Sequence, residues 1–185
     1  GNINCYGDTN GWINVFSIAG GTAPFTYMWS NAFTSSSISG LGEGTYTVTI
    51  TDANGCIATC ESIITSPSVL STSCSAMPLS CFGINDGTVD VAASGGTPGY
   101  NYLWSNSITT SAISGLAAGT YTVTVTDVNG CIATCESIIT SPSALSTSCS
   151  AMPASCFETN NGTVDVVASG GTPGYNYLWS NSITT

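Results

Sequence analysis

The chain has 185 residues and a formal net charge of −10, because it contains ten Asp and Glu residues but no Lys, Arg or His. Without cations to neutralise phosphates, the chain is not expected to bind nucleic acid or an anionic membrane surface, and it lacks the Ser-His-Asp triad and the Schiff-base lysine. No apolar run approaches the ~20 residues of a membrane span, so direct membrane insertion is not expected either.

Apolar and polar residues alternate along several segments, and this pattern predicts β-strands. In GTVDVAAS, Val89 and Val91 face one side while Thr88 and Asp90 face the other. The strands are expected, in chain order, in residues 87–94, 99–106, 119–127, 130–140 and 144–153. The last of these begins a new structural unit.

Turn residues separate these segments. Gly-Gly-Thr-Pro-Gly supplies glycine and proline where a turn needs a positive or a fixed φ. Asn-Gly, in residues 52–55 and 127–130, is the strongest short-range signal for a hairpin. No segment has helical periodicity. The sequence therefore predicts an all-β, immunoglobulin-like sandwich of six or seven short strands.

The sandwich is expected in tandem copies, because the sequence repeats itself about every 75 residues. Trp29, Trp104 and Trp179 mark the three copies. The predicted units are residues 1–66, a copy lacking its first strand; residues 67–141, a complete copy; and residues 142–185, the first part of a third. The short Ser-Pro linkers between them predict a stiff, extended rod cut from a longer polymer.

Cysteine is expected to compensate for the small core of each unit. A unit of ~75 residues buries little apolar surface, and disulfides in an oxidising, extracellular setting supply the missing stability. The chain has nine cysteines, and a complete unit carries four. Zinc is the alternative explanation, but the Cys-x3-Cys and Cys-x6-Cys spacings lie on predicted strands and no His is present. No metal or other cofactor is therefore predicted for these cysteines.

Strand register offers a hypothesis for the disulfide connectivity, which spacing alone does not fix. Cys131 and Cys135 share one face of their strand. If the first strand of the unit runs antiparallel to the last, Cys81 pairs with Cys131 and Cys74 pairs with Cys135. The equivalent bond in the first unit is Cys5–Cys56, and partners outside residues 1–185 are expected for Cys60, Cys149 and Cys156.

Several motifs together resemble a known family. These are Cys-Phe-Gly followed by Asp-Gly, Gly-Gly-Thr-Pro, Trp-Ser-Asn, Ala-Gly-Thr-Tyr-Thr-Val-Thr-Val-Thr-Asp and Asn-Gly-Cys, and in this combination the chain is similar to the SprB repeat. The resemblance implies a secreted, surface-attached filament or adhesin of Bacteroidetes, a role in gliding motility and export by type IX secretion. The loop CFETNNGT and the second cysteine pair, Cys74 and Cys135, depart from the family pattern.

Aromatic residues are the first candidates for a binding surface. Tyr100, Tyr102 and Trp104 could stack on sugar rings, but their inward alternation favours core packing. Trp12 differs, because Thr88 and Thr163 occupy the matching positions in the other copies. Its outward position makes it either an interface anchor or a variant surface residue.

Carboxylates are the second candidates. Asp8, Asp52, Asp86 and Asp127 lie in Asp/Asn/Gly turns that resemble calcium loops, although none has the bidentate Glu of an EF-hand. Calcium is the most plausible inorganic partner, but tight turns need no ion. Glycoside hydrolysis would draw on Asp86, Asp90, Asp127 or Glu136, which no pattern brings together, so no enzyme is predicted. Asn161 fits the glycosylation pattern but is interpreted as a turn residue.

The sequence thus predicts a non-catalytic repeat of an extracellular surface filament or adhesin. Its partners would be neighbouring repeats and other copies in a filament. The alternative is a module that binds a glycan or a solid surface, with calcium as an aid.

Overall fold

The computed structural model describes residues 1–180, which form strands and no helix. No described segment therefore qualifies as a helix able to cross a membrane. The strands are β1 (Gly11–Asn14), β2 (Thr26–Trp29), β3 (Ser37–Leu41), β4 (Gly44–Thr51), β5 (Ile57–Ile64), β6 (Ser71–Met77), β7 (Gly87–Ser94), β8 (Asn101–Trp104), β9 (Ala112–Leu116), β10 (Gly119–Thr126), β11 (Ile132–Ile139), β12 (Ser146–Met152) and β13 (Thr163–Ser169).

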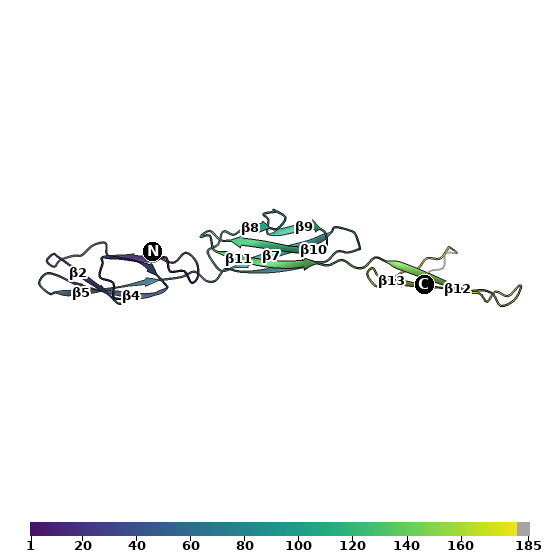
Figure 1. Cartoon of the computed structure of the whole chain (residues 1–185), viewed down its shortest axis with the longest axis horizontal. Helices are drawn as coiled ribbons and strands as arrows, with labels where there is room; N and C mark the ends of the chain where they lie inside the picture. Colours follow the sequence, from purple (N-terminus) through teal and green to yellow (C-terminus); the bar gives the residue numbers. More distant parts are fainter. Residues whose placement is uncertain (181–185) are drawn as a thin grey trace. The chain divides into compact units, whose positions relative to one another are not determined.

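The second repeat is a two-sheet sandwich of six strands, a number within the predicted range. One sheet has the order β6-β7-β9 and the other the order β11-β10-β8. Figure 1 labels β7, β8, β9, β10 and β11 of this repeat. With the strands lettered A, B, C, E, F and G in chain order, the sheets are A-B-E and G-F-C. This is the strand order of an immunoglobulin constant-type domain without its D strand. The predicted immunoglobulin-like fold is confirmed.

Two further hallmarks of that fold are present. Trp104, at the end of β8, is buried in the core and donates its indole N–H to the Thr110 carbonyl at 2.8 Å. Tyr121, near the start of β10, donates its hydroxyl to the Ala117 carbonyl at 3.1 Å. The second contact is a tyrosine corner, which fixes the entry of the chain into strand F.

The core of the sandwich follows the alternation read from the sequence. Val89 and Val91 of β7 are buried, and Val123 and Val125 of β10 are fully buried. Thr122, Thr124 and Thr126, which alternate with these valines, are only half-buried. Because a side chain in a strand changes face at every residue, this pattern directs the β-branched residues into the space between the sheets.

The first repeat has the same arrangement without a strand equivalent to β6 among the described residues. Its sheets are β1-β3 and β2-β4-β5. Trp29 packs in its core with residues of both sheets. The tyrosine corner recurs, with the Tyr46 hydroxyl donating to the Gly42 carbonyl at 3.1 Å.

The third repeat contributes a hairpin. β12 and β13 pair antiparallel, from Ser146 opposite Ser169 to Met152 opposite Thr163. These are the equivalents of β6 and β7.

The described contacts divide the chain into two compact units that do not follow the repeats. The first contains residues 1–73, 92–103 and 124–134, and the second contains, of the described residues, 74–91, 104–123 and 135–180. The division crosses strands of the second repeat, while the linkers at 65–68 and 140–143 lie inside the compact units. Each unit therefore contains one junction between consecutive repeats.

Candidate functional site

The junction in the first compact unit brings four segments together. They are the loop that carries Cys5, the linker, the Gly-Gly-Thr-Pro-Gly turn and the Asp-Val-Asn-Gly-Cys turn; their residues are 4–10, 65–68, 95–99 and 127–131. The first segment belongs to the first repeat, and the last two belong to the second. This meeting of consecutive repeats is the candidate functional site.

The Asp127 carboxylate organises the turn that carries Cys131. Its Oδ1 atom accepts the backbone N–H groups of Asn129 and Cys131, both at 2.9 Å. Its Oδ2 atom accepts the Thr97 N–H at 2.8 Å. The side chain is 2% exposed, and these bonds, that from Thr97 first, hold its pKa below the usual value.

The first repeat builds the same turn around Asp52. Its carboxylate accepts N–H groups from Thr22 at 2.9 Å, Asn54 at 2.9 Å and Cys56 at 2.8 Å. The Thr22 bond is the main reason that the pKa of Asp52 is lowered. Cys56 therefore occupies the same position in its turn as Cys131, because the N–H of each cysteine donates to the aspartate Oδ1 four residues earlier.

The loop that carries the other cysteine is also repeated. In each copy the residue before the cysteine donates its N–H to the side-chain Oδ1 six residues later. The pairs are Asn4 to Asn10 at 3.1 Å, Ser80 to Asp86 at 3.1 Å and Ser155 to Asn161 at 3.0 Å. The Ser80 hydroxyl and N–H lower the pKa of Asp86. Asn161, the residue in the glycosylation pattern, thus serves the loop.

A disulfide joins the loop of the first repeat to the turn of the second. Cys5 is bonded to Cys131, with 5.6 Å between their Cα atoms. Beside it, the Asn129 side chain donates to the Asn4 carbonyl at 3.1 Å and to the Thr97 hydroxyl at 2.8 Å. The bond spans 126 residues of sequence and links consecutive repeats covalently.

This bond corrects two expected pairs, Cys5–Cys56 and Cys81–Cys131. The expectation placed the loop cysteine on the first strand, but Cys81 follows the end of β6 and lies in a loop. In the first repeat, Gly11 after the Cys5 loop pairs with Leu41, just before β4, whereas Cys56 follows the other end of β4. Eight strand residues span about 26 Å. A disulfide needs Cα atoms within about 7 Å, so the intra-repeat bond cannot form.

The second disulfide of the structure is Cys74–Cys135, the pair that strand register favoured. It joins β6 of one sheet to β11 of the other, with 6.0 Å between the Cα atoms. The Thr72 hydroxyl, also on β6, donates to the Thr134 carbonyl at 3.0 Å. Within the described residues, the cysteines without a bond are Cys56, Cys60, Cys81, Cys149 and Cys156, all exposed.

The linker is held from both sides at the junction. Ile3, just before the loop of the first repeat, donates its N–H to the Thr65 carbonyl at 3.1 Å. Gly96, in the turn of the second repeat, donates to the Ser68 carbonyl at 2.9 Å. The neighbouring Gly95 has φ of 75°, and a Cβ there would lie 1.9 Å from the Val69 carbonyl oxygen. Only glycine allows this close approach of the two backbones.

The calcium and catalytic candidates do not form a site. Among residues 1–180 no three His, Cys, Asp or Glu side chains gather where they could hold a metal ion. Asp52, Asp86 and Asp127 instead accept hydrogen bonds within their turns and loops. Asp8 contacts the Asn10 amide at 3.5 Å. Asp90 and Glu136 are exposed.

The aromatic candidates separate into core and surface residues. Trp104 lies in the core, while Tyr100 and Tyr102 are half-buried. Trp12 is 48% exposed on β1, on the outward face as expected. Sequence reasoning missed a recurrent exposed aromatic residue directly after the loop cysteine: Tyr6, Phe82 and Phe157. The signal was the Cys-aromatic pair present in every copy.

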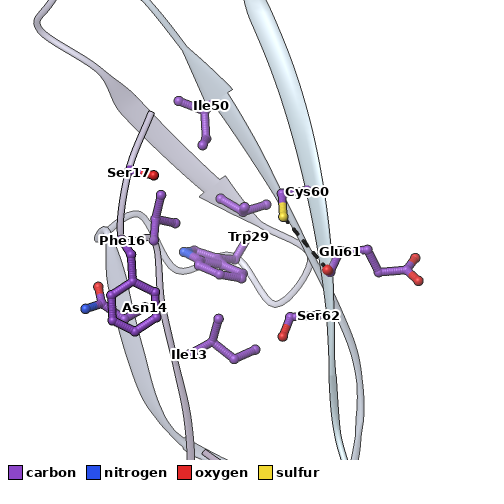
Figure 2. A pocket seen from close by; sticks show the side chains of 11 residues that line it. Ile13, Asn14, Phe16, Ser17, Trp29, Ile50, Cys60, Glu61 and Ser62 are labelled. Carbon is purple, nitrogen blue, oxygen red and sulfur yellow. Dashed lines mark hydrogen bonds between the residues drawn. The ribbon is translucent and has the colours of Figure 1, made fainter. Parts of the chain in front are cut away.

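A cleft of about 320 Å³ opens in the first repeat. Figure 2 shows the Trp29 ring between the segment that carries Asn14 and Phe16 and the strand that carries Cys60. In the second repeat, the equivalent of Cys60 is Cys135, which β6 covers through its disulfide. The cleft therefore lies where the second repeat has its first strand.

Comparison with known families identifies the class of protein. The model of the SprB repeat matches residues 1–34, 74–109 and 149–184. These matches cover more than half of the chain, so the chain belongs to the SprB repeat family. It is a structural repeat of the surface-adhesin type.

Other comparisons add little. No curated protein matches the chain. The solved structure of the amphioxus IgVJ-C2 molecule aligns over 72% of this chain and 97% of that chain, at 13% identity and a TM-score of 0.35. A structure concerned with Dscam isoform specificity aligns over 63% of this chain and 37% of that chain, at 11% identity and a TM-score of 0.33. The immunoglobulin-like fold is defined by the strand order of the two sheets.

Proposed function

We propose that this chain is a non-catalytic segment of a long extracellular surface filament or adhesin, whose repeats form a stiff, disulfide-stabilised rod. Its partners are the neighbouring repeats and other copies within a filament. The family relation supports an exported, cell-attached location, and it is the basis for assigning the chain to type IX secretion and gliding motility in Bacteroidetes.

The covalent bond between consecutive repeats carries this proposal. Two domains on a flexible linker reorient freely, whereas a disulfide beside the linker removes most of that freedom. Here Cys5–Cys131 lies next to a linker whose carbonyl groups accept hydrogen bonds from the repeats on both sides. A junction with a covalent bond and a pinned linker resists bending.

The composition of the surface supports the same role. Only 5% of the residues are charged, so neighbouring copies approach without stripping water from many ions. The carboxylates considered for hydrolysis either serve turns or stand exposed. This distribution favours a structural rather than a catalytic role.

Small-angle scattering and electron microscopy of the 185-residue chain test the stiffness. We expect the oxidised chain to give one narrow distribution of maximum dimension, and the double variant Cys5→Ser/Cys131→Ser to give a broader one. The double variant Cys74→Ser/Cys135→Ser is the matched control, because it removes a bond inside one repeat. Equal breadth for the oxidised chain and the junction variant would contradict the rod.

A second function is favoured by the exposed aromatic residue of each cysteine loop. Tyr6 is 62% exposed, Phe82 63% and Phe157 93%. Aromatic rings at a regular spacing can stack on the apolar faces of sugars, so each loop offers a contact to a glycan or a solid surface.

Pull-down on cellulose and chitin, together with a glycan array, separates the two functions. A spacer retains nothing on these supports. An adhesive module is retained, loses retention in the variant Phe82→Ala and keeps it in the variant Ile138→Ala, which removes an exposed apolar side chain of β11. Repeating the assay with and without calcium tests whether the ion contributes.

A further inference from the structure

The second compact unit contains a junction that repeats the first one. Leu79 donates its N–H to the Thr140 carbonyl at 3.0 Å, as Ile3 does to Thr65. Gly171 donates to the Ser143 carbonyl at 2.8 Å, as the matching glycine of the second repeat does to its own linker. The linkers of both junctions are therefore held in the same way.

The loop of the second repeat already contacts the third repeat. The Thr172 hydroxyl donates to the Ser80 carbonyl in a long hydrogen bond of 3.4 Å. Ser80 precedes Cys81 as Asn4 precedes Cys5. The Asn4 carbonyl accepts a hydrogen bond from the Asn129 side chain of the second repeat. The carbonyl beside the loop cysteine thus faces the next repeat at both junctions.

One element distinguishes the junctions. The turn that places Cys131 against Cys5 is followed by β11 in the second repeat, whereas the given sequence of the third repeat ends at Thr185, before its own turn. In the first repeat the turn cysteine is present, but no loop cysteine of residues 1–180 meets it. Asp52 holds Cys56 in the same turn.

We propose that consecutive repeats are joined throughout by a disulfide from the loop cysteine of one repeat to the turn cysteine of the next. Cys81 and Cys156 are loop cysteines that would each bond to the turn cysteine of the following repeat. Cys56 is a turn cysteine that would bond to the loop cysteine of the preceding repeat. The inference deepens the proposed function, because it requires that the chain belong to a longer array.

The proposal accounts for every free cysteine of the described residues. Two bond types occur: one between repeats, as in Cys5–Cys131, and one within a repeat, as in Cys74–Cys135. Cys60 matches Cys135 and Cys149 matches Cys74, so both belong to the type within a repeat. Their partners would lie in the remaining parts of their own repeats, whereas the partners of Cys56, Cys81 and Cys156 would lie in neighbouring repeats.

The oxidation requires a disulfide-exchange oxidant, for which oxidised glutathione serves in vitro. One cysteine thiolate attacks the glutathione disulfide and releases one glutathione thiolate, leaving a mixed disulfide. The second cysteine thiolate attacks the protein sulfur of that mixed disulfide and releases the second glutathione. Two protein thiols are oxidised, one glutathione disulfide is reduced, and two protons leave with the glutathione.

Extension of the chain by one turn tests the proposal. The 185-residue chain is followed by a copy of residues 111–141, which completes the third repeat, and is oxidised with glutathione. We expect Cys81 to lose its labelling by iodoacetamide and to be linked, in peptic peptides, to the new turn cysteine. Cys56 keeps its labelling, because the protein made for this test starts at residue 1 and contains no preceding loop cysteine.

The matched control carries serine at the new position that corresponds to Cys131, and in it Cys81 should be labelled. Cys149 reports folding of the completed repeat, since it should bond the new equivalent of Cys135 in both proteins. Labelled Cys81 together with protected Cys149 overturns the proposal. The rod would survive that result if scattering still gives a narrow distribution, so the two failures are distinguishable.

A variant of the unextended chain gives an independent answer. In Cys5→Ser, Cys131 loses its partner while Cys81 of the same repeat stays free. We expect both to be labelled and no link between them, because loop and turn lie at opposite ends of a repeat. A Cys81–Cys131 bond in this variant, or Cys5–Cys56 in the native chain, overturns the proposal even if the extended chain fails to fold.

Discussion

The first and second repeats contain the same turn, yet its cysteine is free in one and bonded in the other. Asp52 and Asp127 accept the same three backbone N–H groups, so local sequence sets the turn in both. Cys131 meets Cys5 of the preceding repeat, and Cys56 has no such neighbour among residues 1–180. The difference shows that the turn forms from its own local sequence, whereas the disulfide forms only where a neighbouring repeat supplies the second cysteine.

The same contrast holds for the first strand. β6 covers one side of the second sandwich and bonds Cys135 through Cys74, whereas Cys60 borders a cleft in the first. The two repeats therefore serve as each other's controls.

The largest expected effect comes from the buried tryptophan. Trp104→Ala should destabilise the second repeat by roughly 3–5 kcal/mol, because it leaves a cavity between the sheets. Trp29→Ala should cost less, since that ring borders the cleft and the site is already open on one side. Urea unfolding followed by circular dichroism measures both. Leu103→Ala, at a 55% exposed position, should change stability by no more than about 0.5 kcal/mol.

The disulfide within the second repeat comes next. The double variant Cys74→Ser/Cys135→Ser should lower the free energy of unfolding by roughly 4 kcal/mol, the chain-entropy estimate for a loop closed across 61 residues. Cys60→Ser should leave stability unchanged, because Cys60 forms no disulfide and its exposed thiol donates only to the Glu61 carbonyl, at 3.8 Å. Thermal melts of the three proteins provide the comparison. Equal loss in the Cys60 variant would mean that thiol removal itself, rather than the bond, is destabilising.

The turn carboxylates give a smaller effect that differs between repeats. Asp127→Ala should cost about 1–3 kcal/mol, because three part-buried backbone N–H groups lose their common acceptor. Asp52→Ala should cost less, since Asp52 is only half-buried and water can replace the carboxylate. Chemical denaturation measures each variant. A larger loss at Asp52 would show that burial does not decide the cost.

The same carboxylates should make stability depend on pH. Hydrogen bonds lower the folded-state pKa of Asp52, Asp86 and Asp127 below the unfolded value of about 3.9. Their contribution is thus fully present above that value and is lost as pH falls through the folded-state pKa. In thermal melts recorded in buffers from about pH 6 down to about pH 2, the melting temperature should fall at the acidic end of the range. The fall should be shallower in Asp127→Ala, and an unchanged slope would reject the assignment.

The tyrosine corners should give the smallest effect, and an equal one in both repeats. Tyr121→Phe and Tyr46→Phe each remove one hydroxyl-to-carbonyl hydrogen bond of 3.1 Å, which is worth about 1 kcal/mol. Both tyrosines are half-buried, and neither corner involves a disulfide. Urea unfolding of the two variants should give matching losses. A clear difference would mean that the missing first strand weakens the corner of the first repeat.

The sequence by itself determined the turns, the direction of the side chains and five of the strands, whereas β9 was not among the expected segments. Alternation in residues 119–127 placed Val123 and Val125 in the core, because a strand turns each successive side chain to the opposite face. Asn-Gly marked both hairpin turns, since glycine reaches the positive φ of Gly55 and Gly130. These features depend on neighbouring residues only, and the printed sequence contains them.

Only the tertiary structure decided which cysteines meet and what the turn carboxylates do. Register correctly placed Cys74 opposite Cys135, because both lie on strands. Register did not predict the Cys5–Cys131 bond, because these two cysteines lie outside the strands, at the ends of different repeats. Asp127 looked like a calcium ligand in sequence and is a hydrogen-bond acceptor in the fold. Pairing in space depends on how the ends of repeats face each other, and alternation along one strand carries no information about that.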